Sequence, residues 1–184
     1  MSEQKKFGDF TGLAENYSKF RPAYSNEVLD AILGIVKNNP EKMRAADVGA
    51  GTGIWSRMME KRGCKISSVE PNHDMRTFGI QDSQGLNIEW FEGNGEKTGL
   101  SESTYDLVTM ASSFHWVDFE QGLAEFSRIL KPNGHFCALW NPRMIELNPL
   151  LVEIEEELKS MVPDMKRKSS GRASFTDELT QNLW

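Results

Sequence analysis

The sequence predicts an α/β fold in which a parallel sheet is covered by helices on both faces. Apolar segments typical of buried strands alternate along the chain with amphipathic segments typical of helices. A glycine-rich loop at residues 49–53 follows the first such strand and precedes a helix, which is where parallel sheets bind ligands. With 184 residues, the chain can form one domain with a sizeable core.

The first forty residues predict two helices, over 9–20 and 25–39. The residue before a proline avoids the helical conformation, so Arg21-Pro22 ends the first helix and Asn39-Pro40 ends the second. In the second helix, Ser25 or Asn26 can act as the N-cap, and a broad apolar stripe follows it.

Five predicted strands and four more helices occupy the rest of the chain. Continuous or alternating apolar residues predict strands over 44–48, 65–70, 87–93, 105–111 and 135–141. Helical spacing predicts helices over 54–63, 72–80, 118–134 and 148–162. Gly63 closes the first of these helices, and Pro132 and Gly134 end the third.

Bulk properties narrow the class of protein. The formal net charge of −6 argues against a nucleic-acid partner. No run of 18 apolar residues is present and the first residues do not resemble a secretory signal, so we expect a cytoplasmic protein without a membrane partner. The two cysteines, Cys64 and Cys137, lie in no metal-binding spacing, which predicts free thiols and no metal site.

The glycine loop is the most informative short segment. Gly49, Gly51 and Gly53 alternate with other residues, which predicts a ligand that approaches the main chain closely. The dinucleotide fingerprint needs a third glycine at position 54, where this chain has Ile54, so an NAD-dependent oxidoreductase is disfavoured. The loop would suit a pyrophosphate, or an uncharged ribose and thioether arm.

Glu70 ends the second predicted strand. A carboxylate at this position can accept hydrogen bonds from both hydroxyls of a ribose. This feature does not discriminate between cofactors by itself, because NAD enzymes use it too.

Five segments together resemble class I S-adenosylmethionine-dependent methyltransferases. They are "DVGAGTG" (47–53), Glu70, "EGNGEKTGL" (92–100), "YDLVTMASSFHWVD" (105–118) and "ILKPNGHFCALWN" (129–141), in the order of that family. The resemblance covers residues 10–142 and implies a Rossmann-like doubly wound sheet. "FHWVD" and "NYSKFRPAY" are similar to a narrower branch, the type 11 methyltransferases that include trans-aconitate-type carboxyl methyltransferases.

The resemblance implies S-adenosyl-L-methionine as cofactor, with S-adenosyl-L-homocysteine as product. It assigns Asn94 to the adenine amino group and Arg21 to the methionine carboxylate. The full set of expected cofactor-binding residues is Tyr17, Arg21, Asp47, Gly49, Ala50, Gly51, Gly53, Glu70, Pro71, Gly93, Asn94, Gly95, Ala111 and Ser112.

Methyl transfer from a sulfonium is an in-line displacement, so the protein mainly aligns the reacting atoms and excludes water. His115 could be a general base for a hydroxyl or amine acceptor, or it could orient a carboxylate acceptor. Trp116 could line the acceptor pocket. The alternatives are a histidine bonded to backbone and a tryptophan packed in the core.

One domain is expected over 1–184, with a helical cap at 1–40, a cofactor-binding core at 41–142, and a helix with a polar tail at 143–184. The family sheet has the strand order 3-2-1-4-5-7-6, and strands suited to its last two places are not recognisable here. Two functions follow: methyl transfer to a small-molecule carboxylate, hydroxyl or amine, or cofactor binding by a truncated or non-catalytic module that acts within an oligomer. We expect the edge of strand 135–141 to be covered, by residues 148–184 or by a second subunit in a homodimer.

Overall fold

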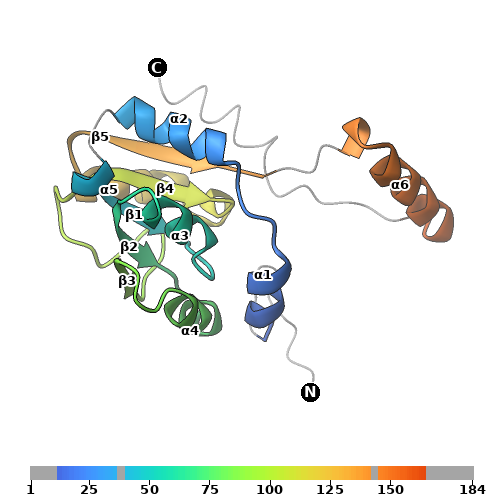
Figure 1. Ribbon diagram of the computed structural model, residues 1–184, viewed down its shortest axis with the longest axis horizontal. Coiled ribbons are helices and arrows are strands. Elements are labelled where there is room, and N and C mark those ends of the chain that lie inside the picture. The colour runs from blue at the N-terminus through green and yellow to red at the C-terminus, as the bar shows by residue number, and fades with distance from the viewer. Residues whose placement is uncertain (1–11, 37–39, 142–144, 165–184) are drawn as a thin grey trace. The chain divides into compact units, whose positions relative to one another are not determined.

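The computed structural model describes residues 12–36, 40–141 and 145–164, and the first of its two compact units contains a five-stranded parallel sheet (Figure 1). Its strands are β1 (Arg44–Val48), β2 (Lys65–Val69), β3 (Ile88–Phe91), β4 (Tyr105–Ala111) and β5 (Leu130–Leu139). Their order in the sheet is β3-β2-β1-β4-β5 and each neighbouring pair is parallel. This confirms the α/β class and the expected order of the five predicted strands. The chain order reverses between β1 and β4, which makes their carboxyl ends the switch point where such sheets bind ligands.

The register of the sheet brings the glycine loop next to the end of β2. β1 and β2 pair without interruption from Arg44 opposite Lys65 to Val48 opposite Val69. Because both strands end at the same level, the amides of Gly49 and Ala50 donate to the Val69 carbonyl at 2.9 and 3.0 Å. Glu70, the next residue along the chain, therefore lies beside the loop.

The described part of the chain contains six helices. They are α1 (Ala14–Phe20), α2 (Asn26–Val36), α3 (Ile54–Glu60), α4 (His73–Asp82), α5 (Phe119–Ile129) and α6 (Pro149–Met161), with short 3-10 turns at Pro40–Lys42, Phe114–Trp116 and Ile145–Leu147. Asn72, Asp118 and Asn148 cap α4, α5 and α6, because each side chain accepts a hydrogen bond from a backbone amide in the first turn of its helix.

Helices cover both faces of the sheet. On one face, α2 and α3 pack against the strands in a single hydrophobic cluster. The helices contribute Leu29, Leu33, Trp55 and Met59, and the strands contribute Ala45, Ile66, Leu107 and Leu139. Successive strand side chains point to opposite faces, and Phe136 of β5 stacks on Phe126 of α5 with ring centroids 4.8 Å apart. The sheet is thus buried between α2 and α3 on one side and α5 on the other.

The predicted helix over 118–134 is wrong in its last residues. α5 ends at Ile129, and Leu130 is already extended, with ψ of 143°. Leu130 pairs with Tyr105 of β4, after which the register shifts so that His135 pairs with Leu107. Pro132 disfavours the helical conformation at Lys131, and the Lys131 ammonium instead lies 2.9 Å from the Asp106 carboxylate on β4.

The first helix begins at Ala14, so the predicted start is wrong for residues 12 and 13, while residues 9–11 lie outside the described residues. α1 lies against α4 (Figure 1). Two polar contacts join them: the Gly12 amide donates to Asp74 Oδ2 at 3.0 Å, and the Ser18 hydroxyl donates to the Asp82 carboxylate. Tyr17 projects from the middle of this helix.

The chain divides into two compact units, Met1–Leu139 and Trp140–Trp184. Within the second unit, no residue of α6 is buried, although its cap and amphipathic composition match the predicted helix over 148–162. In the described part of the chain β5 pairs with β4 alone, and the expected cover for its other edge stays a prediction. No helix among the described residues has the length and apolar character needed to span a bilayer.

Replacing Phe126 with alanine should destabilise the protein by about 3–5 kcal/mol, because a buried aromatic ring is lost and a cavity remains between α5 and β5. Urea denaturation followed by circular dichroism measures this change. Phe20→Ala is the matched control, since that ring is 77% exposed, and it should change stability by less than about 0.5 kcal/mol. Equal effects of the two substitutions would contradict the assignment of Phe126 to the core.

Candidate functional site

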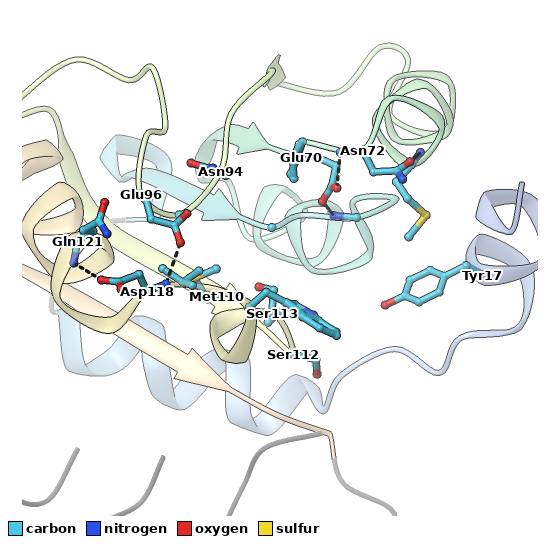
Figure 2. Close-up of a pocket in the computed structure, with 18 residues that line it drawn as sticks. Tyr17, Glu70, Asn72, Asn94, Glu96, Met110, Ser112, Ser113, Asp118 and Gln121 are labelled. Carbon is cyan, nitrogen blue, oxygen red and sulfur yellow. Dashed lines mark hydrogen bonds between the residues drawn. The ribbon is translucent and has the colours of Figure 1, made fainter. Parts of the chain in front are cut away.

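A cavity of about 720 Å³ opens at the carboxyl ends of the central strands (Figure 2). Five parts of the chain form its walls: α1, the glycine loop, the segment after β2, the loop of residues 94–96, and the segment from the end of β4 to the first turn of α5. Ten residues expected from the sequence line it: Tyr17, Gly49, Gly51, Glu70, Pro71, Asn94, Gly95, Ala111, Ser112 and Trp116. The sheet therefore brings together most of the expected set.

Glu70 holds the glycine loop in place. Its Oε2 accepts a hydrogen bond from the Gly51 amide at 2.8 Å, and its Oε1 accepts one from the Asn72 amide at 2.9 Å. Burial raises the pKa of this carboxyl, while the two amides and Arg76 oppose that shift. An ionised carboxylate has about four acceptor sites, so Glu70 can receive further donors from the cavity that it lines.

The three alternate glycines have different causes, which corrects the expectation that a ligand requires all of them. All three have positive φ values, 69°, 59° and 76°. A Cβ on Gly49 would lie 2.6 Å from the Ser113 Cβ, and one on Gly53 would lie 2.9 Å from the Trp90 ring. The protein's own side chains thus exclude larger residues at these two positions. Only at Gly51 would a Cβ meet nothing closer than 3.5 Å, and that glycine faces the cavity.

Asp47 lies beneath the glycine loop rather than in the cavity wall. Its side chain is fully buried, and Oδ2 accepts a hydrogen bond from the Ser56 hydroxyl at 2.5 Å. Ser56 in turn accepts one from Ser68 at 2.8 Å. Burial raises the pKa of Asp47 to about 7, although the hydrogen bonds from Ser56 and Thr109 act in the opposite direction. Asp47 therefore joins β1, β2 and α3 below the site.

The segment after β4 is held by contacts from two other parts of the chain. Ser112 adopts a left-handed backbone conformation with φ of 59°, which is uncommon for a residue other than glycine. Its hydroxyl oxygen accepts a hydrogen bond from Tyr24 at 2.9 Å, and Ser113 donates to the Val48 carbonyl at 3.0 Å. The N-terminal segment and the end of β1 thus fix this wall of the cavity.

Tyr17 and Trp116 contribute aromatic walls. Burial raises the pKa of the Tyr17 hydroxyl, and the Arg21 guanidinium lies 5.4 Å from the centre of its ring. Trp116 is 46% exposed although it lines the cavity. An exposed aromatic ring at a cavity wall is available for contact with a ligand.

Six expected site residues do not line the cavity: Arg21, Asp47, Ala50, Gly53, Gly93 and His115. Gly93 lines a smaller neighbouring hollow. The His115 ring lies 4.6 Å from the Trp116 ring, its Nδ1 is buried without a hydrogen-bond partner among the described residues, and burial lowers its pKa. Its catalytic role stays a prediction.

Sequence reasoning missed eight lining residues: Asn72, Met75, Glu96, Met110, Ser113, Val117, Asp118 and Gln121. Asn72 and Asp118 carry a signal that could have been used, because both are N-cap residues directly after a strand or loop at the carboxyl edge of the sheet. Glu96 and Gln121 carry none, since their position depends on how two separate loops meet.

The described residues hold no group of three or more His, Cys, Asp or Glu side chains placed to bind a metal ion. Cys64 and Cys137 are free thiols, and burial raises the pKa of each.

Comparisons with known proteins bear on the family and on the fold. Residues 46–138 match the protein family described as a methyltransferase domain. An uncharacterised methyltransferase of Mycobacterium tuberculosis is 29% identical over 137 residues, which cover 74% of this chain and 52% of the relative. Demethylmenaquinone methyltransferase of Chlorobaculum parvum is 32% identical over 110 residues, covering 59% of this chain and 44% of that protein. The chain spans about half the length of the curated relatives it matches.

A solved structure from Methanococcus maripaludis has a similar fold. That protein is described as a candidate S-adenosyl-L-methionine-dependent methyltransferase, and it superposes with a TM-score of 0.70 at 21% identity. The match covers 100% of this chain and 88% of the other. At this identity the likeness establishes the fold.

Asp47→Asn should flatten the dependence of stability on pH between about 4 and about 7. The folded protein retains a proton on Asp47 that the unfolded chain, with its ordinary pKa of 3.8, has released. The free energy of unfolding therefore falls as pH rises through this window, by at most about 4 kcal/mol. Asparagine does not titrate, so the variant lacks this contribution to the pH dependence. Urea denaturation at several pH values measures it.

The surface variant Glu120→Gln is the control for removing one carboxyl group. Parallel curves of unfolding free energy against pH for Asp47→Asn and the unmodified protein would contradict the burial of a titrating Asp47.

Proposed function

The chain belongs to the methyltransferase domain family matched by residues 46–138, and from this premise we propose that it binds S-adenosylmethionine and transfers its methyl group to a small molecule. One observation carries the proposal. Glu70 and the glycine loop, held together by a 2.8 Å hydrogen bond, line a cavity of about 720 Å³ at the switch point of the sheet.

The residues around the cavity suit this cofactor. Gly51 presents main chain to the cavity without a side chain, with room for a ligand where its Cβ would lie. Glu70 has acceptor sites left after its two amide hydrogen bonds, so it can receive both hydroxyls of a ribose. This supports the expected adenosyl group and, with Ile54 in place of the third fingerprint glycine, disfavours a dinucleotide.

We assign the methionine arm to the end of the cavity where Tyr17, Gly51 and Ser112 lie. Tyr17 lines that end from α1, and the Arg21 guanidinium lies over the Tyr17 ring. Arg21 is exposed, so a pairing with the methionine carboxylate requires its side chain to reach around Tyr17.

When bound, S-adenosylmethionine supplies a methyl group on a sulfonium that is already activated for displacement. The protein then has to orient the acceptor and exclude water. The left-handed Ser112, fixed by Tyr24, and the aromatic rings of Tyr17 and Trp116 provide walls for this purpose. Since Trp116 lines the cavity and His115 does not, we propose Trp116 as the acceptor contact.

A cofactor-binding module without catalysis is the second candidate. The observation that favours it is the sheet of the described residues, which has five strands where the family resemblance implies seven. Both candidates need the same cofactor site, so only transfer separates them.

Incubating the protein with S-adenosylmethionine labelled in the methyl group and with a pool of small metabolites should yield a labelled small molecule. Mass spectrometry of the products identifies the acceptor as a carboxylate, a hydroxyl or an amine. If the Glu70→Gln variant yields no labelled product, the methyl transfer depends on this site. Cofactor binding without any labelled product would favour the non-catalytic module.

Glu70→Gln should weaken the binding of S-adenosylhomocysteine by about 10- to 100-fold, because a charged acceptor for the ribose is lost while one acceptor oxygen is kept for an amide. Isothermal titration calorimetry measures the Kd. Glu89→Gln, at an exposed position of β3, is the control and should bind as the unmodified protein does. An unchanged Kd for Glu70→Gln would remove Glu70 from the site.

A further inference from the structure

Arg76, on α4, holds the main chain at the end of β2. Its Nη1 donates to the Glu70 carbonyl at 2.7 Å and to the Pro71 carbonyl at 3.4 Å. Its Nη2 donates to the carboxylate of Glu92, the residue after β3, at 2.8 Å. The Arg76 side chain is 12% exposed, whereas that of Glu92 is 76% exposed. One guanidinium therefore ties the segment after β2 to α4 and to the end of β3.

The segment that Arg76 holds carries the side chain on which the proposed cofactor site depends. The Glu70 carboxylate already accepts hydrogen bonds from the Gly51 and Asn72 amides (Figure 2). To receive both hydroxyls of a ribose as well, it must use all of the about four acceptor sites of an ionised carboxylate. A protonated carboxyl has an O–H donor in place of one acceptor site, so it cannot serve two amides and two hydroxyls together. Ribose binding at Glu70 therefore requires the ionised form.

Burial works against that form, because it raises the pKa of Glu70, and the charge of Arg76 opposes this effect together with the two amides. Other charged or titratable groups lie on the elements around Glu70 or line the same cavity: Tyr17, Arg21, Asp47, Glu92, Glu96 and Asp118. Four of them are carboxyl groups, and Asp47 and Glu70 repel each other when both are ionised. The Arg21 guanidinium lies over the Tyr17 ring. Arg76 is thus the cation whose charge offsets the burial of Glu70.

We infer that Arg76 is a positioning residue of the cofactor site, an inference that rests on the proposed function. It fixes the main chain of Glu70 and Pro71, and its positive charge keeps the Glu70 carboxylate able to accept from the ribose in mildly acidic solution. Arg76 is not among the residues that line the cavity, so it acts through Glu70 rather than by touching the cofactor. Its pairing with the exposed Glu92 orients the guanidinium and contributes little by itself.

The dependence of affinity on pH separates this role from a merely structural one. An arginine that only held the main chain would, when removed, weaken binding by the same factor at every pH. The affinity that depends on ionised Glu70 is fully present above the pKa of Glu70 and is lost as pH falls through it. Without the charge of Arg76 that pKa rises, so the loss should begin at a higher pH.

Isothermal titration calorimetry of the full chain with S-adenosylhomocysteine, at about pH 6 and about pH 8, tests the inference. At the higher pH, Arg76→Gln should raise the Kd by about 3- to 10-fold, because the hydrogen bonds to the Glu70 and Pro71 carbonyls are weakened. At the lower pH, the ratio of the variant Kd to the unmodified Kd should be larger again by at least about 3-fold. Titration of the ligand affects both proteins and cancels in this ratio. Arg76→Lys keeps the charge, so its ratio should differ by less than about 2-fold between the two pH values.

Arg57→Gln is the matched control. The Arg57 side chain is 20% exposed and also donates to a carbonyl of the site, that of Thr52 in the glycine loop, at 2.6 Å. Its removal should change the Kd by the same factor at both pH values. Equal ratios at the two pH values for Arg76→Gln, or a pH-dependent loss in Arg76→Lys or Arg57→Gln, would overturn the inference and leave the proposed cofactor standing.

Carbon-13 NMR of the glutamate carboxyl groups in the protein without ligand supplies a readout that does not need the cofactor. The Glu70 signal is assigned by its loss in Glu70→Gln, and its titration midpoint should lie at a higher pH in Arg76→Gln than in the unmodified protein. An unchanged midpoint would contradict the inference, as would a raised midpoint in Arg76→Lys, which decides the case if Arg76→Gln does not fold. If the unmodified protein binds no S-adenosylhomocysteine, the proposed function fails, and the midpoint still decides whether Arg76 keeps Glu70 ionised.

Discussion

The hydrogen bond from the Gly51 amide to Glu70 is the interaction on which the site depends. It joins the loop after β1 to the residue after β2, and the second oxygen of the same carboxylate holds the Asn72 amide at the start of α4. Uninterrupted pairing from Arg44–Lys65 to Val48–Val69 makes this contact unavoidable, because it sets the two strand ends level. A buried carboxylate is costly unless amides solvate it, and the two amide hydrogen bonds leave further acceptor sites on a side chain that lines the cavity.

The floor of the site uses a second buried carboxylate in a different way. Asp47 is fully buried and does not line the cavity, and its carboxylate accepts hydrogen bonds from the Ser56 and Thr109 hydroxyls. Its burial lowers stability progressively as pH rises from about 4 to about 7, because the unfolded chain releases this proton more readily than the folded protein does. The hydrogen bond from Ser56 to Asp47 links β1 to α3, and these two elements flank the glycine loop. The link therefore holds both ends of the loop in position.

Sequence patterns predicted the strands and the central part of the site because those depend on local signals. The glycine loop and Glu70 lie at the ends of adjacent strands, and parallel pairing puts such ends together. The end of α5 was misplaced because the pairing of Leu130 with Tyr105 is a tertiary contact that helical periodicity does not reveal. The meeting of Glu96 with Asp118 likewise depends on a contact between two loops that no local pattern reveals.

The two sides of the cavity differ in how firmly they are held. The floor rests on strands whose residues are almost fully buried, and such segments open only with a large part of the global unfolding free energy. The α1 wall is joined to α4 by exposed hydrogen bonds from Gly12 and Ser18, and exposed polar contacts contribute little. Moving α1 therefore costs much less than moving the floor. A ligand that contacts both Glu70 and Tyr17 opposes the displacement of α1, because that displacement would break its contact with Tyr17. Occupancy of the cavity therefore stabilises the position of α1 more than that of any strand beneath it.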